Sequence, residues 1–220
     1  CQDIQGETFE YPEEFFKEKV HSIRRPRPDD FQIKEAAEKI KNSKKPIIIS
    51  GGGVFYSDAI DELGNFAVKH NIPVTQTVMG YSTMKKDHSH FLGPIGGLGG
   101  KAANNLAKQT DLAIAIGTKL GDFTTGSWAN FENPNFGLIS MNITRHDANK
   151  HLAQAVIGDA KISIEELSQG LGDWKAPDDW YKKSRDELKS WDEYVDKESG
   201  PTNQEVPSYA HTVGAIYRNS

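Results

Sequence analysis

Short, continuous apolar runs alternate with amphipathic stretches through the middle of this chain. The first run covers residues 46–49, and an unbroken run of this length is typical of a parallel strand covered on both faces. Three glycines follow at positions 51–53, where the strand is expected to end. Apolar residues then recur at helical spacing at positions 59, 60, 63, 66 and 67, which predicts an amphipathic helix. A strand, a glycine turn and a helix in this order predict the first unit of a doubly wound α/β domain.

The same patterns continue along the chain. They predict strands at residues 46–50, 73–77, 112–116, 138–143 and 155–157, and helices at residues 31–42, 58–70, 101–109 and 160–171. Residues 79–100 are rich in glycine and are expected to be irregular. The fold class that follows is α/β, a three-layer, doubly wound domain in which strands and helices alternate.

Both ends of the chain differ in character from its middle. Residues 1–32 are polar and include the run RRPRPD at 24–29, whose prolines favour an extended linker. Residues 33–172 form the predicted central domain. Residues 173–206 hold aromatic side chains among charges, which is typical of a helix on the outside of a larger body, and then a linker. Residues 207–220 begin a further helix, and because the chain starts at Cys1 and stops inside this helix, we expect it to be part of a longer polypeptide.

Charge and composition argue against several classes of function for this chain. The formal net charge is −5, and the lysines and arginines form no continuous basic stripe, so nucleic acid is not an expected partner. No apolar run approaches the ~20 residues that span a bilayer, so a membrane location is not expected either. The only cysteine among the 220 residues is Cys1, which excludes an internal disulfide and favours a reducing, cytoplasmic location.

The glycines after the first strand are the first candidate binding site. Gly51, Gly52 and Gly53 could approach a diphosphate closely, since they carry no Cβ atom. However, GGG is not the GxGxxG fingerprint of dinucleotide-binding proteins, and the lysine and serine or threonine of a P-loop do not follow it. A structural role in a tight turn is therefore favoured over a ligand.

Two further candidate sites follow later strands. The loop GTKLGDFTTGS at residues 117–127 contains Thr118, Lys119 and Leu120, and we expect it at the carboxyl edge of the sheet, where open α/β sheets bind ligands. This loop fits a nucleotide-binding loop and a polar crossover loop equally well. The segment NITRHD at Asn142–Asp147 follows the next strand, where an acidic or amide side chain would lie at the usual place of a ribose, and Asn142 also suits a helix cap. With the glycines, these residues would form a pocket of the nucleotide-binding type.

The sequence offers neither a catalytic constellation nor a metal site. His88 and His90 are two positions apart and His146 and His151 are five apart, with no zinc motif around either pair, so we expect surface histidines. Ser50 precedes glycines but does not stand in the GxSxG pattern of a nucleophile elbow, and no base can be assigned to it. We therefore expect no catalytic residue and no metal ligand in this chain.

The order of these motifs resembles a known family. Taken in order, PIIISGGGV, IPVTQT, GPIGGLGG, DLAIAIGTKLGDFTTGSW and LISMNI resemble the central domain of thiamine-diphosphate-dependent enzymes, a group that includes acetolactate synthase and pyruvate oxidase. Within this group, FFKEKVHSIRRPRPD (15–29), GGGVFYS (51–57), GDFTTGSW (121–128) and PSYAHTVGAIYR (207–218) are most similar to the hydrolases that cleave a carbon–carbon bond in bacterial myo-inositol breakdown. The resemblance covers about residues 10–218.

The resemblance implies a six-stranded parallel sheet flanked by helices. It also implies thiamine diphosphate and Mg²⁺ in the intact enzyme, bound by an upstream domain with a catalytic glutamate and a downstream domain with a GDG…N motif. This sequence contains neither, so the chain alone is expected to be a catalytically inactive scaffold. Its expected partners are those N- and C-terminal domains and further copies of itself in a homo-oligomer such as a dimer.

Some members of the family bind a nucleotide such as FAD or ADP in this domain, and others leave it empty. Gly51, Gly52, Thr118, Lys119 and Asn142 fall at the matching strand ends. This chain has GTKLGDFTTG where the flavin-binding members carry an arginine-bearing loop, which weakens the expectation of FAD. Two alternatives remain open: a decarboxylating relative of acetolactate synthase, and an independent nucleotide-binding module that takes FAD, ADP or NAD.

Overall fold

The computed structural model describes residues 2–22 and 24–219. Cys1, Ile23 and Ser220 lie outside the described residues, and the predictions that rest on Cys1 lie there with it. The strands are β1 (Pro46–Ser50), β2 (Val74–Gln76), β3 (Phe91–Pro94), β4 (Leu112–Ile116), β5 (Gly137–Asn142) and β6 (Gln154–Ile157). The α-helices are α1 (Gln2–Gln5), α2 (Asp30–Lys41), α3 (Gly52–Tyr56), α4 (Ile60–His70), α5 (Lys101–Gln109), α6 (Asp122–Thr125), α7 (Arg145–Ala148), α8 (Ala160–Leu171), α9 (Asp178–Ser199) and α10 (Tyr209–Arg218). Short 3₁₀ helices are η1 (Glu13–Phe16), η2 (Val78–Gly80) and η3 (Lys150–Leu152).

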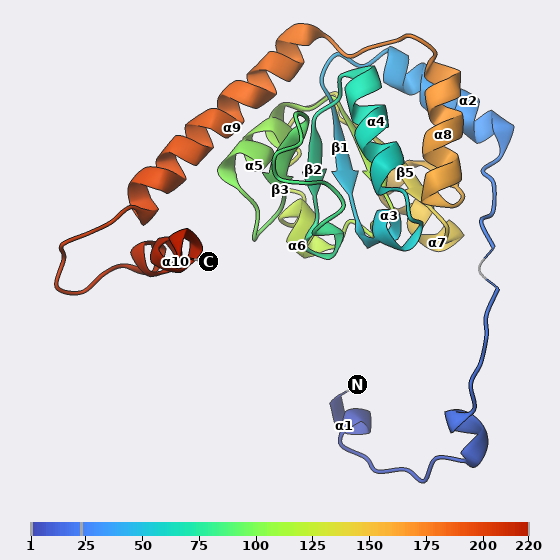
Figure 1. The fold of residues 1–220 in the computed structure, drawn as a ribbon. Coiled ribbons are helices and arrows are strands. Elements are labelled where there is room, and N and C mark those ends of the chain that lie inside the picture. Colours follow the sequence, from blue (N-terminus) through green and yellow to red (C-terminus); the bar gives the residue numbers. More distant parts are fainter. Residues whose placement is uncertain (1, 23, 220) are drawn as a thin grey trace.

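The six strands form one sheet in which every neighbouring pair is parallel. Their order is β3-β2-β1-β4-β5-β6, so the chain starts in the middle of the sheet and winds first to one edge and then to the other (Figure 1). The register between β1 and β4 places Pro46 opposite Leu112 and Ser50 opposite Ile116. The predicted doubly wound α/β fold and the six parallel strands implied by the family resemblance are both confirmed.

Helices cover both faces of the sheet and give the domain three layers. On one face, α2, α4 and α8 pack over Ile48, Ile114 and Ile139. On the other face, α5 and α9 pack over Ile47 and Ile49. Because successive side chains of a strand point to opposite faces, the unbroken apolar run of β1 supplies both layers of the core.

The irregular stretch predicted at residues 79–100 is wrong in part, because it contains strand β3. This strand has the sequence FLGP, and glycine and proline both weaken the strand signal in a sequence. β3 lies at the edge of the sheet, where a proline at the last position is tolerated. Its register to β2 shifts between Val74 and Thr75, and Gly93 adopts a positive φ of 97° at that point.

The helix predicted at residues 58–70 begins later than expected, and a separate short helix precedes it. Gly51 caps α3, and Gly52 and Gly53 form its first turn. Asp58, with a positive φ of 54°, separates α3 from α4. The glycines therefore end the strand and start a helix, rather than forming an open turn.

The predicted N-terminal linker is fixed to the domain along residues 24–29. Asp159 caps α8 by accepting hydrogen bonds from the Lys161 and Ile162 amides, and its backbone N–H donates to the Pro26 carbonyl (2.9 Å). Arg25 Nη1 lies 3.2 Å from Asp159 Oδ2, and Ser57 Oγ donates to Asp159 Oδ1 at 2.7 Å. This contact ties the segment before α2 to the last βα unit, beside edge strand β6.

Aromatic residues after position 173 hold helix α9 on the sheet. Trp180 is 3% exposed, and its Nε1 donates to the Pro46 carbonyl at 2.8 Å. The loop before α9 is fixed by His70, whose Nδ1 lies 2.8 Å from the Trp174 carbonyl. In Figure 1, α9 runs along the side of the domain and its second half projects beyond it toward α10. Within the described residues, no helix combines the length and the apolar content that crossing a bilayer requires.

One of the predicted surface histidines is buried beneath α9. His90 is 6% exposed, and its ring stacks on Tyr181 with centroids 4.5 Å apart. Burial, and then the charges of His88 and Arg185, lower the pKa of His90 to about 4. The prediction of a surface histidine is therefore wrong at this position, because the covering helix comes from a segment 90 residues away that the local pattern does not reveal.

This buried imidazole predicts that the chain loses stability as the pH falls from 6.5 toward 4. The unfolded chain binds a proton at His90 near pH 6.5, whereas the folded chain binds it only near pH 4, so protonation favours unfolding within that window. At pH 5 the loss from this residue is about 2 kcal/mol relative to pH 7.5. Urea denaturation at the two pH values, for the wild type and for His90→Phe, measures it. The variant keeps the ring stacked on Tyr181 and is expected to lose less stability; equal losses would contradict the assignment.

Candidate functional site

The loops after β1 and β4 meet at the carboxyl edge of the sheet, where the strand order reverses. Open α/β sheets bind their ligands at this switch point. Here the two loops are hydrogen-bonded to each other: the Gly51 amide donates to the Ile116 carbonyl and the Gly53 amide to the Gly117 carbonyl, both at 2.9 Å. These two amides are therefore engaged within the protein and do not point to a diphosphate.

The glycines at this crossing allow two backbones to touch. A Cβ atom on Gly51 would lie 2.4 Å from the Gly117 oxygen, and one on Gly53 would lie 2.6 Å from the Gly117 Cα. Gly117 itself has a φ of +62°, which residues with a side chain adopt only under strain. A Cβ on Gly52 would lie 2.9 Å from the Met79 oxygen in the loop after β2. The structure thus gives all three predicted glycines a packing role.

A cavity of about 430 Å³ opens beside this crossing, between α3, the ends of β4 and β5, and the start of α8. We refer to it as the β4–β6 cavity. Four of the predicted site residues line it, namely Gly53, Thr118, Lys119 and Asn142. Gly51, Gly52 and Leu120 are outside the lining, and Leu120 is 3% exposed within the apolar core. Asp147, the last residue of the third candidate segment, also lines it, and sequence reasoning missed Arg24, Ser57 and Asp159, which line it too.

Asn142 braces the floor of the β4–β6 cavity. Its Nδ2 donates to the Thr118 carbonyl (3.2 Å), and its Oδ1 accepts from the Thr144 amide (2.9 Å). The side chain therefore links the ends of β4 and β5 and caps the turn that leads to α7. Both ends of the amide are occupied by protein, which agrees with the capping interpretation and leaves this residue little capacity to bind a ribose.

The charges around the cavity are partly neutralised in pairs. Lys150 Nζ lies 2.7 Å from Asp147 Oδ1, and this hydrogen bond, with the nearby charges of Lys150 and Lys119, lowers the pKa of Asp147. Arg25 neutralises Asp159, so the carboxylate that accepts from Ser57 is not placed to act as a base. Lys119 brings positive charge to the lining, so an anionic ligand suits this cavity better than a cationic one.

The described residues do not fit a magnesium–diphosphate site. Across residues 2–22 and 24–219, no group of three or more histidine, cysteine, aspartate or glutamate side chains is placed to hold a metal ion. Mg²⁺ on a diphosphate is usually held by one or two carboxylates, and the two acids of the β4–β6 cavity are already paired with Lys150 and Arg25. What this site can offer chemically is binding of a small anionic molecule.

Comparison with known proteins places the domain within a family. Residues 33–167 match the model for the thiamine pyrophosphate enzyme central domain. The chain is 48% identical over 170 residues to a 3D-(3,5/4)-trihydroxycyclohexane-1,2-dione hydrolase of Clostridium perfringens strain 13, covering 77% of this chain and 27% of the relative. Proteins of the same name from Clostridium botulinum Eklund 17B and Clostridium tetani E88 are 42% and 39% identical over 200 and 209 residues, covering 89% and 91% of this chain and 30% and 32% of the relatives. The chain therefore spans about a third or less of the length of these curated relatives.

Proposed function

Because this chain belongs to the thiamine pyrophosphate enzyme central-domain family, we propose that it is the central domain of a hydrolase that opens the ring of 3D-(3,5/4)-trihydroxycyclohexane-1,2-dione in myo-inositol catabolism. The observation that carries the proposal is the 48% identity to a relative of that name over 170 residues. Such an enzyme would act in the cytoplasm. Thiamine diphosphate with Mg²⁺ would supply the carbanion chemistry, bound by parts of the enzyme other than the residues described here.

In this proposal the domain is a scaffold that positions other parts of the enzyme. The hydrogen bonds from the Gly51 amide to the Ile116 carbonyl and from the Gly53 amide to the Gly117 carbonyl support a rigid role, because they hold the loops after β1 and β4 together. The residues that could carry acid–base chemistry around the β4–β6 cavity are held in ion pairs. The residues of this domain would therefore hold and orient the other parts of the enzyme, and the chain alone would be inactive.

Exposed apolar side chains at the carboxyl edge support contact with other domains or with a second copy. Phe55, Met79, Leu98, Phe123 and Ile143 follow β1, β2, β3, β4 and β5 in turn, and each is more than half exposed. A patch of this kind on one side of a domain is typical of an interaction surface. We assign it to the N- and C-terminal domains of the same polypeptide and to a homo-oligomer of the intact enzyme.

The proposal predicts that the 220-residue chain shows no turnover. Supplied with thiamine diphosphate, Mg²⁺ and the cyclic dione, the purified chain should release no product above background, and thiamine diphosphate with Mg²⁺ should leave its thermal midpoint unchanged. An intact enzyme that contains this domain should hydrolyse the dione under the same conditions. Turnover by the chain alone would contradict the scaffold role. An intact enzyme that leaves the dione unchanged and decarboxylates pyruvate would favour the acetolactate synthase-like alternative.

The β4–β6 cavity favours a second candidate function, the binding of a nucleotide such as ADP, FAD or NAD. Its volume of about 430 Å³ lies within the range of small-molecule sites, and Lys119 lines it. A ligand at ~100 times its dissociation constant would stabilise the chain by ~2.7 kcal/mol. A rise in thermal midpoint with ADP that Lys119→Ala removes and Lys182→Ala keeps would support this function, since Lys182 is exposed on α9.

A further inference from the structure

The N-terminal arm, residues 2–22, carries aromatic side chains that the domain does not cover. All of its residues are exposed, and Figure 1 shows the segment before α2 running away from the sheet. The rings of Tyr11, Phe15 and Phe16 form one cluster, with centroids 4.8 Å apart for the first two and 5.4 Å apart for the last two. Phe16 is 72% exposed. A gathering of exposed rings of this kind is typical of an interaction surface.

The arm also carries most of the net charge of the chain. It holds six acidic residues and two lysines, a balance of −4, whereas the whole chain has a formal net charge of −5. Glu14 is paired with Lys17 at 3.5 Å. Glu13 and Glu18 stand before and after the two phenylalanines and make no ion pair within the described residues. The surface that receives these phenylalanines is therefore expected to be apolar at its centre and cationic at its rim.

The β4–β6 cavity has this combination of properties. Tyr56, Met141 and Ile143 contribute apolar side chains to its lining. Its two acids are neutralised by ion pairs. Two cations of the lining, Arg24 and Lys119, are exposed and make no ion pair in the part of the chain that the structure describes. An acidic, aromatic segment therefore matches this cavity in both polarity and charge.

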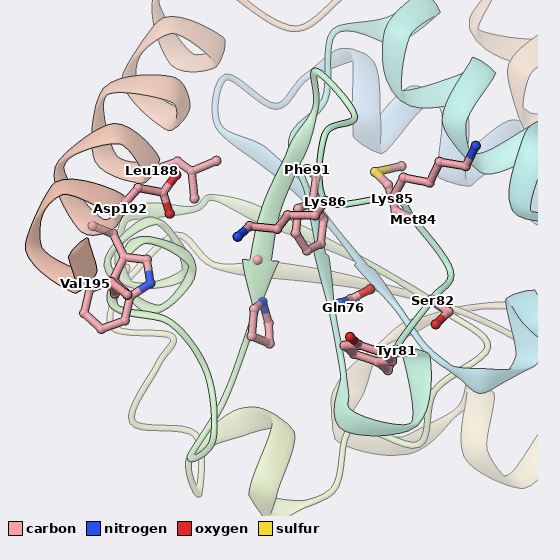
Figure 2. Close-up of a pocket in the computed structure, with 13 residues that line it drawn as sticks. Gln76, Tyr81, Ser82, Met84, Lys85, Lys86, Phe91, Leu188, Asp192 and Val195 are labelled. Atoms are coloured by element: carbon pink, nitrogen blue, oxygen red, sulfur yellow. The ribbon is translucent and has the colours of Figure 1, made fainter. Parts of the chain in front are cut away.

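A second cavity, of about 480 Å³ between α9, edge strand β3 and the loop after β2, matches the arm less well. Figure 2 shows Asp192 reaching this cavity from α9, and Lys86 extending toward α9. Lys86 Nζ already donates to the Tyr217 hydroxyl at 3.2 Å, and the carboxylate of Asp192 would repel an acidic segment. The charges therefore favour the β4–β6 cavity as the seat of the phenylalanines.

The course of the arm favours the cavity of a second copy over the cavity of its own chain. The ion pair between Arg25 and Asp159 holds the root of the arm at the rim of its own β4–β6 cavity. Residues 17–22 form no helix or strand and contain no glycine, proline, asparagine or aspartate, the residues that favour a tight turn back. Eight positions separate Phe16 from Arg24, and they span at most about 28 Å. The carboxyl edges of two copies would therefore face each other.

We propose that the N-terminal arm of one copy places Phe15 and Phe16 in the β4–β6 cavity of a second copy, which does the same in return. Glu13 and Glu18 then face the cations at the rim of the cavity. The inference names a contact of the homo-oligomer in the proposed function and rests on that part of it. Its test measures association alone, so a failure of this contact and an absence of dione hydrolysis are separate results.

Sedimentation equilibrium of the 220-residue chain measures this association. The wild type should show a monomer–dimer equilibrium. Phe15→Ser combined with Phe16→Ser should weaken the dimer about 100-fold, because both rings then lose their apolar contact. Both side chains are exposed in the single chain, so this arm variant should fold like the wild type. Tyr209→Ser is the control, since it removes an aromatic side chain that is 94% exposed outside the arm, and it should dimerise like the wild type.

A cavity variant tests the other side of the contact. Lys119→Glu combined with Ile143→Glu places two carboxylates at exposed positions of the lining and should weaken the dimer at least ~10-fold. Lys182→Glu, at an exposed lysine of α9, is the charge control and should dimerise like the wild type. Mixed one to one, the arm variant and the cavity variant should form a heterodimer that is tighter than either homodimer, because one intact arm then meets one intact cavity.

Three results would overturn the proposal. The first is a wild-type chain that stays monomeric up to ~1 mM, as it would if each arm filled its own cavity. The second is wild-type association of the cavity variant, which would show that the arms pair with each other. The third is a mixture of the arm and cavity variants that associates no more tightly than either variant alone.

Discussion

Gly51→Ala is expected to lower the free energy of unfolding by about 3 kcal/mol in the absence of any ligand. The new Cβ would lie 2.4 Å from the Gly117 oxygen and 2.5 Å from Thr118 Cβ, and the first of these contacts is to backbone. Relief would require the loops after β1 and β4 to move apart, which would stretch the hydrogen bond from the Gly51 amide to the Ile116 carbonyl. Urea denaturation of the purified chain measures the loss.

The matched control is Gly121→Ala, in the same loop region. A Cβ at Gly121 meets nothing within 4 Å, and the residue has an ordinary φ of −69°, so the change should stay within about 0.5 kcal/mol. The pair distinguishes the two interpretations of the glycine motif. If Gly51→Ala is as stable as the wild type and only weakens ADP binding, the motif serves a phosphate and the packing interpretation is wrong.

Trp180→Ala should lower the free energy of unfolding by about 3–5 kcal/mol, the range for removing a large buried side chain. Trp180 is a buried residue of α9 that packs with Ile47 and Ile49 of β1, and its indole N–H donates to the Pro46 carbonyl. Alanine would leave a void at this position and would leave that carbonyl without its donor. Thermal or urea denaturation followed by circular dichroism measures the effect.

Two substitutions in the same helix calibrate this result. Trp180→Phe keeps most of the buried ring and removes the hydrogen bond, so about 1–2 kcal/mol should be lost. Tyr194→Ala truncates an aromatic side chain that is 50% exposed, and it should cost less than 1 kcal/mol, roughly the size of one aromatic pair. If Trp180→Ala leaves the main transition unchanged, α9 is not part of the cooperative unit formed by the sheet.

The sequence predicted best those elements whose burial can be inferred from their own residues, without knowledge of what packs against them. β1 and β4 are continuous apolar runs and α8 has a regular apolar face, so their burial follows from composition and spacing alone. β3 was missed because its pairing with β2 overrides the glycine and proline in FLGP. The burial of His90, and the cavity between α9 and β3, depend on contacts between segments about 90 to 120 residues apart, which no local pattern contains.

The sequence predicted where the candidate site lies, but it did not predict which side chains contact one another there. Thr118, Lys119 and Asn142 follow neighbouring strands, and the structure brings them to one cavity because carboxyl ends of parallel strands share an edge. The family inferred from the motif order is confirmed by the match over residues 33–167. The carboxylate of Asp159 and its arginine partner were not foreseen, since Arg25 lies 134 positions away along the chain.

The ion pair between Arg25 and Asp159 and the packing of α9 hold the two ends of the domain at opposite edges of the sheet. Residues 24–29 are held at the β6 edge, whereas α9 contacts the β3 edge. Six strands place these two edges five inter-strand spacings apart, which is about 24 Å. The width of the sheet therefore sets the separation of these two contacts, and adding or deleting an edge strand would change it by about 5 Å.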